Sequence, residues 1–210
     1  STAFKDWSKT PVEKRASIVR RIAEIFSEKR DNLAQIISQE MGKPINEAKE
    51  EVEFFSDIFN YFADNGPTQM EDQTLVGSEG GNARLQRRPL GVLLGVMPWN
   101  YPFWQVLRFA VPTLTAGNTA ILKHASNVTG CALAIEKLFE RAGYPQGCFT
   151  SIIANHDAIE KLIANDIIKA VSLTGSEKAG KSIAATAGKH LKKTVLELGG
   201  NNACIVLDDA

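Results

Sequence analysis

Six short apolar runs lie between Gly91 and the end of the chain, and stretches with helical periodicity separate most of them. The runs occupy residues 92–96, 119–123, 149–154, 167–173, 193–198 and 203–207. They are rich in Val, Ile and Leu without polar alternation, which is typical of strands in a parallel sheet covered on both faces. Right-handed crossovers would join them, and ligands of such sheets bind at the carboxyl ends of the strands. The pattern predicts an α/β fold.

The first third of the sequence predicts three helices. The first begins at Thr10, a hydroxyl N-cap followed by Pro11. The second runs from Asp31 to a stop at Gly42 and Pro44, and the third covers residues 46–65, with Gly66 just past its end. The texture then changes: Gly80 and Gly81 separate two short alternating runs, which predicts a β-hairpin.

Composition points to a small-molecule partner. Lys plus Arg equals Asp plus Glu at 24 each, so no net field favours nucleic acid or an anionic membrane. No apolar stretch approaches the roughly 18 residues of a membrane span, and the amino terminus has no signal-peptide core. The 3 cysteines form neither a disulfide framework nor a CxxC metal pair. We expect a cytoplasmic protein without a metal site.

A phosphate-binding motif offers a rival interpretation. Residues 175–182 read GSEKAGKS and match the P-loop pattern, while the later CIVLDD resembles a strand that ends in a Mg²⁺-binding aspartate. A P-loop must wrap around phosphates, yet Glu177, Lys178 and Ala179 are helix formers, and Glu177 would bring an acid towards an anion. The sequence therefore favours a helix that starts at Ser176, with a P-loop nucleotide hydrolase as the alternative.

Four motifs carry a resemblance to a known family. They are VMPWNYP at 96–102, AGNTAILK at 116–123, LTGS at 173–176 and LELGG at 196–200. In this order and spacing they resemble the amino-terminal part of the aldehyde dehydrogenase superfamily, closest to succinate-semialdehyde dehydrogenases. The resemblance implies helices of the cofactor domain over 1–73, a hairpin of the oligomerisation region over 74–90 and an incomplete, Rossmann-like NAD(P)-binding domain over 91–210. It also implies a homo-oligomer.

The resemblance assigns two catalytic residues. Asn100 would donate its side-chain amide to the aldehyde oxygen as negative charge develops. Glu197 would be the general base that activates water against a thioester intermediate. The family nucleophile is a cysteine beyond Ala210, whereas Cys131, Cys148 and Cys204 all lie in segments with a structural character. The catalytic domain is therefore expected to be absent from this sequence.

Further residues are implied at the cofactor and the substrate. Thr174, Gly175 and Ser176 would open a helix towards the pyrophosphate of NAD or NADP. Lys123 would bind ribose hydroxyls, and Ser126, where NAD-preferring relatives often carry a glutamate, leaves room for a 2′-phosphate. Cofactor contacts are also implied for Pro98, Trp99, Leu198 and Gly199.

Arg108 follows Asn100 by eight residues in a segment predicted to be helical. The resemblance makes it the ligand of the distal carboxylate of a semialdehyde. Asn201 departs from the lysine common after the last motif. Three hypotheses remain at this point: a fragment of an NAD(P)-dependent aldehyde dehydrogenase, a P-loop nucleotide hydrolase, and a non-catalytic cofactor-binding or assembly module.

Overall fold

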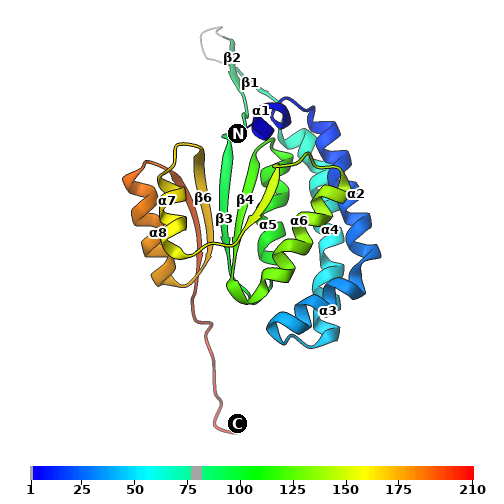
Figure 1. The fold of residues 1–210 in the computed structure, drawn as a ribbon, viewed down its shortest axis with the longest axis vertical. Coiled ribbons are helices and arrows are strands. Elements are labelled where there is room, and N and C mark those ends of the chain that lie inside the picture. The colour runs from blue at the N-terminus through cyan, green and yellow to red at the C-terminus, as the bar shows by residue number, and fades with distance from the viewer. Residues whose placement is uncertain (1, 77–81) are drawn as a thin grey trace.

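The computed structural model of the chain describes residues 2–76 and 82–210, and these form an α/β structure with one long and one short sheet (Figure 1). The helices are α1 (Thr2–Trp7), α2 (Val12–Glu28), α3 (Arg30–Met41), α4 (Ile45–Gln69), α5 (Trp104–Thr115), the 3₁₀ turn η1 (Ser126–Val128), α6 (Thr129–Ala142), α7 (His156–Ala164) and α8 (Glu177–Lys189). The strands are β1 (Gln73–Val76), β2 (Asn82–Leu85), β3 (Val92–Met97), β4 (Thr119–His124), β5 (Phe149–Ile152), β6 (Ile168–Gly175) and β7 (Lys193–Leu198).

The long sheet has the order β5-β4-β3-β6-β7, and each neighbouring pair is parallel. The crossovers through α5 and α6 extend the sheet on one side of β3, and those through α7 and α8 extend it on the other side (Figure 1). The connection therefore changes direction between β3 and β6, which is the topological switch point where ligands of such sheets bind. The predicted α/β fold is confirmed.

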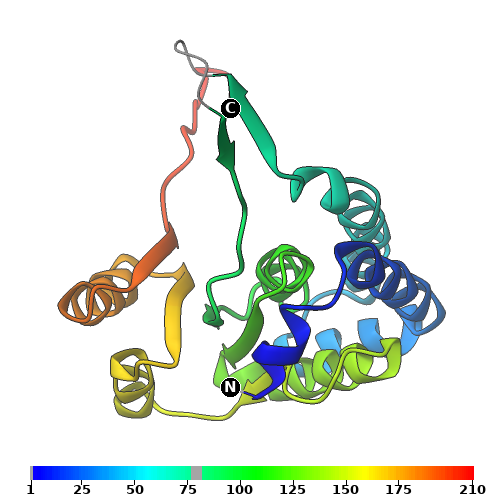
Figure 2. The ribbon, with the colours of Figure 1, turned by 90° about the horizontal axis from the view of Figure 1, so that it is seen from above.

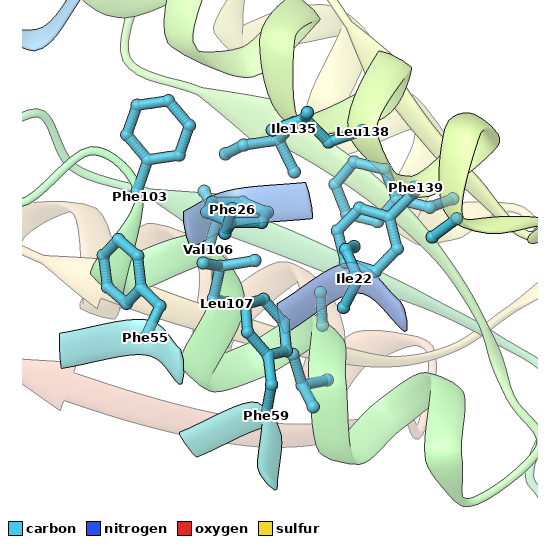
Figure 3. Close-up of a cluster of buried hydrophobic side chains, with 14 of the residues drawn as sticks. Ile22, Phe26, Phe55, Phe59, Phe103, Val106, Leu107, Ile135, Leu138 and Phe139 are labelled. Atoms are coloured by element: carbon cyan, nitrogen blue, oxygen red, sulfur yellow. The ribbon is translucent and has the colours of Figure 1, made fainter. Parts of the chain in front are cut away.

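Two apolar clusters hold the layers together. The larger one joins α2, α4, α5 and α6, and its centre is aromatic (Figure 3). The Phe26 ring lies 5.1 Å from the Phe59 ring and 6.0 Å from the Phe103 ring, between centroids. The smaller cluster joins β3 and β6 to α7 and α8 on the opposite face of the sheet. Both faces of β3 are therefore covered, as its uninterrupted apolar sequence predicts.

Two predictions about helix ends are wrong. α2 begins at Val12 after Pro11, and the Thr10 hydroxyl donates to the carbonyl of Asp6 instead of capping the helix. α4 runs on through Gly66 and Pro67 to Gln69. Gly66 does not end the helix and lies at a contact with α5, where a Cβ on Gly66 would meet Thr115 Cγ2 at 2.7 Å. α3, by contrast, does end at Gly42, which has the left-handed φ of 77°.

The predicted hairpin is present as antiparallel strands β1 and β2, which project from the body (Figures 1 and 2). Gly80 and Gly81 lie outside the described residues. The apolar run at 203–207, predicted to be a strand, is irregular instead. Ile205, Val206 and Leu207 are 84%, 76% and 65% exposed, because this segment extends away from the sheet and pairs with no described strand. No helix of the described residues is long and apolar enough to cross a bilayer.

Candidate functional site

The carboxyl ends of four parallel strands bring the predicted residues to one edge of the sheet. Met97 at the end of β3 lies in register with His124 at the end of β4. On the other side of β3, Thr174 of β6 lies in register with Glu197 of β7. Because the strands are parallel, the turns that follow them, including the turn of Asn100, leave the sheet at the same edge.

The turn after β6 forms a helix start. Ser176 is the N-cap of α8, and its side-chain oxygen accepts a hydrogen bond of 3.2 Å from the amide of Ala179. The helix begins at Glu177, so residues 177–180 are helical and cannot wrap around a triphosphate. Lys181, the lysine of the P-loop match, lies on an exposed face and pairs with Glu177 at 3.5 Å. The P-loop interpretation is therefore wrong.

A cleft of about 430 Å³ opens at the switch point between β3 and β6. Its apolar walls come from β3, β6, α7 and α8, and its polar groups include Lys123 and Ser176. We call it the switch-point cleft; its main lining residues are Val96, Lys123, Ile159, Leu173, Ser176 and Ile183. The cleft thus combines apolar walls with the Lys123 ammonium and the N-terminus of the 13-residue helix α8. This combination suits a ligand that has both a ring and a phosphate group.

Ser126 lies beside Lys123 in a smaller depression at the ends of β4 and β5. It is the first residue of η1, and the N-cap of that turn is Ala125. The hydroxyl of Thr129 donates to the carbonyl of Ser126. The structure therefore brings Lys123 and Ser126 together, with Ser126 exposed at the rim.

Asn100 lines a separate cavity of about 630 Å³ between α4 and the start of α5. Lys43 and Glu51 lie in its wall as a buried ion pair, with Nζ 2.5 Å from Oε2 and side chains 7% and 2% exposed. The other carboxylate oxygen of Glu51 accepts from the amides of Phe103 and Trp104, both at 3.2 Å.

The Lys43 ammonium also lies 3.6 Å from the centre of the Tyr101 ring, next to Asn100. Lys43 and Glu51 thus contact the residues that directly follow Asn100. This pair was not predicted from the sequence. The feature that could have indicated it is a lysine just before a helix with an apolar face and a glutamate in the second turn of that helix.

Arg108 extends from α5 to the ends of β6 and β7. Its guanidinium donates to the hydroxyl of Thr174 at 3.0 Å and lies 3.8 Å from a carboxylate oxygen of Glu197. The side chains of Arg108 and Glu197 are 37% and 55% exposed, so water screens this pair. The structure places three predicted residues in one cluster and leaves the guanidinium half-open to solvent.

The cysteines differ from the prediction in one respect. Cys131 and Cys148 are buried, and burial raises the pKa of both thiols, that of Cys148 to about 12. Cys204 is exposed, because the segment that was expected to be a strand is not paired. Among the described residues, no cysteine lines the cavity of Asn100.

His124 is a second residue that sequence reasoning missed. It ends β4 and is 6% exposed, and its ring nitrogens contact backbone groups of both the Asn100 turn and the turn after β4. Burial lowers the pKa of its imidazole, which favours the neutral ring. A histidine that ends a buried strand, next to a predicted cofactor ligand, was the available signal.

Comparisons with known proteins agree on one family. The family model for the aldehyde dehydrogenase family matches residues 1–210. A succinate-semialdehyde dehydrogenase (NADP(+)) of Deinococcus radiodurans is 50% identical over 206 residues, and a succinate semialdehyde dehydrogenase (NAD(P)+) of Escherichia coli is 44% identical over 211 residues. These alignments cover 98% and 100% of this chain but 43% and 45% of the relatives.

A solved structure is similar over the same range. The crystal structure of succinic semialdehyde dehydrogenase from Streptococcus pyogenes, in complex with NADP+, matches with a TM-score of 0.94 at 38% identity. The match covers 99% of this chain and 46% of that chain. The chain therefore spans less than half the length of the relatives that it matches.

Proposed function

Because the chain belongs to the aldehyde dehydrogenase family, we propose that it supplies most of the cofactor site of an NAD(P)-dependent enzyme that oxidises an aldehyde to a carboxylic acid. The observation that carries this proposal is the switch-point cleft, which joins Lys123 and the N-terminus of α8 at the carboxyl edge of the sheet. We further propose that residues 1–73, 74–90 and 91–210 are the helical part of the cofactor domain, an association hairpin and the NAD(P)-binding sheet. Similarity to succinate-semialdehyde dehydrogenases supports succinate semialdehyde as the substrate.

The residues of the switch-point cleft fit a dinucleotide. Ile159 and Ile183 offer apolar contacts for an adenine ring, and the Lys123 ammonium can donate to ribose hydroxyls. The free amides at the start of α8 suit the pyrophosphate, which Thr174, Gly175 and Ser176 approach from the end of β6. Pro98, Trp99, Leu198 and Gly199, at the ends of β3 and β7, are the further proposed contacts.

The catalytic roles follow from what each side chain can donate or accept. A bound nicotinamide would supply the oxidant for the aldehyde. Asn100 donates its amide to the developing oxyanion, and Glu197 accepts a proton from the water that releases the acid. A thiolate must form the covalent bond to the aldehyde carbon. Cys131 and Cys148 are buried with raised pKa values, and the exposed Cys204 lines neither the switch-point cleft nor the cavity of Asn100, so we expect this chain alone not to oxidise aldehydes.

Cofactor binding tests the proposal directly on this chain. We expect the fluorescence of NADPH to report saturable binding, and Lys123→Met to weaken this binding by roughly 10- to 100-fold, because a charged hydrogen bond contributes about 1.5 to 3 kcal/mol. Lys181→Met, on the exposed face of α8, is the matched control and should bind as the parent chain does. Equal binding by both variants would remove Lys123 from the site, and no binding by the parent chain would refute the cofactor proposal.

The residue at position 126 bears on whether the site accepts NADP, which carries a 2′-phosphate, as well as NAD. Ser126 carries no charge at the rim beside Lys123, which supports acceptance of NADP as well as NAD. We expect Ser126→Glu to weaken NADPH binding much more than NADH binding, because a carboxylate would repel the phosphate. An equal loss for both nucleotides would place the 2′-phosphate elsewhere.

Arg108 is the proposed ligand of the substrate carboxylate. Its guanidinium is half-exposed beside Thr174 and Glu197, and a fork of donors can hold a carboxylate bidentately. In a full-length enzyme containing this chain, Arg108→Leu should lower kcat/KM for succinate semialdehyde by roughly 10- to 100-fold. It should spare an uncharged aldehyde of similar length. Equal loss for both substrates would make Arg108 structural.

A further inference from the structure

We propose that His124 is a positioning residue that couples the cofactor-side turn after β4 to the turn that carries Asn100. The inference rests on the proposed function, in which Lys123 and Ser126 hold the cofactor and Asn100 donates to the aldehyde oxygen. His124 also lines the depression that holds Lys123 and Ser126, but it is 6% exposed and its ring nitrogens face backbone groups. It acts through backbone groups of both turns.

The imidazole of His124 lies between the two turns. Its Nε2 is 2.8 Å from the carbonyl oxygen of Pro102, two residues after Asn100. Its Nδ1 is 3.0 Å from the amide nitrogen of Ala125, the residue that leads into η1. The carbonyl oxygen of Met97, at the end of β3, lies 3.2 Å from the same Nδ1.

Only one form of the ring satisfies both turns. If Nε2 carries the proton, it donates to Pro102 while Nδ1 accepts from Ala125. The Met97 carbonyl oxygen then faces the Nδ1 lone pair and receives no hydrogen from the ring, so this form makes two of the three contacts as hydrogen bonds, one to each turn. If Nδ1 carries the proton, the ring donates to Met97, but the Ala125 amide loses its acceptor and the Nε2 lone pair faces the Pro102 oxygen. A doubly protonated ring would set an N–H against the Ala125 amide. The contacts therefore assign the neutral Nε2–H tautomer.

Strand alternation makes this ring a link between two sites. The side chain of Lys123 lines the switch-point cleft, and the next side chain along β4, that of His124, leaves the opposite face of the sheet. A ligand that fixes Lys123 and the η1 turn therefore fixes the His124 ring. Pro98 and Pro102 limit how the Asn100 turn can move, since each has a locked φ angle.

The far side of the Asn100 turn is already anchored. Glu51 accepts from the amides of Phe103 and Trp104, and it is buried with Lys43. The hydrogen bond from His124 to Pro102 holds the turn from the sheet side. Asn100 thus lies in a turn with one anchor in α4 and one in β4, and of these two anchors the one in β4 adjoins Lys123 and Ser126.

Two substitutions separate the two contacts of the ring. In His124→Asn the amide oxygen can replace Nδ1 as the acceptor for Ala125, but no donor reaches Pro102. In His124→Gln the amide nitrogen can replace Nε2 as the donor to Pro102. His190→Asn at the end of α8, outside both turns, is the control. Imidazole ¹⁵N spectra of the unsubstituted chain first test the tautomer.

Amide hydrogen exchange at Phe103, Trp104 and Gln105 reports the anchoring of the Asn100 turn. In the free chain we expect His124→Asn to speed this exchange by roughly 2- to 10-fold, the effect of one lost buried hydrogen bond, and His124→Gln to change it less. Added NADPH should slow exchange at these amides in the parent chain and in His190→Asn. His124→Asn should still bind NADPH within about threefold but lose the slowing.

The outcomes distinguish the inference from the function on which it rests. An Nδ1–H or charged ring at neutral pH, or free-chain exchange in His124→Asn equal to that of the parent, would overturn the positioning role. NADPH-dependent slowing that persists in His124→Asn would overturn the coupling. If the parent chain binds no NADPH, the proposed function fails and the coupling fails with it, while the free-chain exchange still decides whether His124 positions the turn.

Discussion

The three cysteines differ in solvent exposure. Burial raises the pKa of Cys148 to about 12, and that of Cys131 rises as well, whereas Cys204 is exposed. At pH 8 only about one Cys148 thiol in ten thousand would be the reactive thiolate. We therefore expect iodoacetamide to alkylate the folded chain once, at Cys204, and the urea-unfolded chain three times, as measured by intact mass. Comparable labelling of Cys131 in the folded chain would contradict the burial.

Removal of one partner of the buried Lys43–Glu51 pair should cost much more stability than removal of one partner of a surface pair. Lys43→Met leaves a buried carboxylate without its counterion, which costs about 3 to 5 kcal/mol of unfolding free energy. The matched control is Arg20→Met, which breaks the exposed pair with Asp64 and should cost less than about 1 kcal/mol. Urea denaturation of both variants gives the comparison, and equal losses would show that Glu51 is satisfied by the two helix amides alone.

At the scale of elements, local patterns predicted most helices but not the contacts that end or cap them. α3 ends at Gly42 as the sequence predicts, because its end needs a residue with a left-handed φ angle and glycine adopts this conformation readily. The start of α6, in contrast, is capped from α3: Glu40 accepts from the amides of Gly130 and Cys131 at 2.6 and 2.8 Å. A cap supplied from 90 residues away leaves no local signal, so the sequence could not reveal it.

At Gly66, helix propensity favours an alanine while the contact with Thr115 of α5 favours glycine. Substitution by alanine measures which effect is larger. A methyl group there gains helix propensity of up to about 1 kcal/mol but would lie 2.7 Å from Thr115 Cγ2. Thr115 cannot turn away without breaking the bond from its hydroxyl to the Val111 carbonyl. We expect Gly66→Ala to lower the unfolding free energy by about 1 to 3 kcal/mol.

Gly188→Ala is the control for Gly66→Ala, because Gly188 is also helical and a Cβ there meets nothing within 4 Å. It should leave stability unchanged or raise it by up to about 1 kcal/mol. Thermal unfolding of the two variants measures the difference. A stable Gly66→Ala chain would mean that α4 and α5 can separate by a few tenths of an ångström without loss.

On the scale of the whole molecule, the parallel topology explains how much of the site could be predicted. Residues at the ends of β4, β6 and β7 were found from sequence because a parallel sheet gathers its strand ends at one edge. The link from Arg108 to Thr174 and Glu197 was not, since it depends on how α5 crosses the sheet. His124 and the Lys43–Glu51 pair were missed for the same reason: their partners are backbone groups and side chains of other elements.

The edge strand β7 and the exposed segment that follows it lead to a prediction about association between copies of the chain. β7 is an edge strand with five exposed residues among its six, and the segment after it exposes Ile205, Val206 and Leu207. An unpaired edge next to an uncovered apolar run favours association between copies. Residues 201–210 are all exposed, so their removal should leave the unfolding temperature within about 2 °C of the parent, because little apolar surface is buried there.

The same removal should shift the sedimentation of a concentrated sample towards smaller species. Val206→Asp in the full chain tests the run without shortening the chain: a charge there should reduce association as the deletion does, because it opposes apolar contact between copies. Ala203→Asp adds the same charge outside the three apolar residues and is the matched control. If association persists unchanged in Val206→Asp and in the deletion, the contact lies on another surface, with the edge of β7 and the β1–β2 hairpin as the next two to substitute.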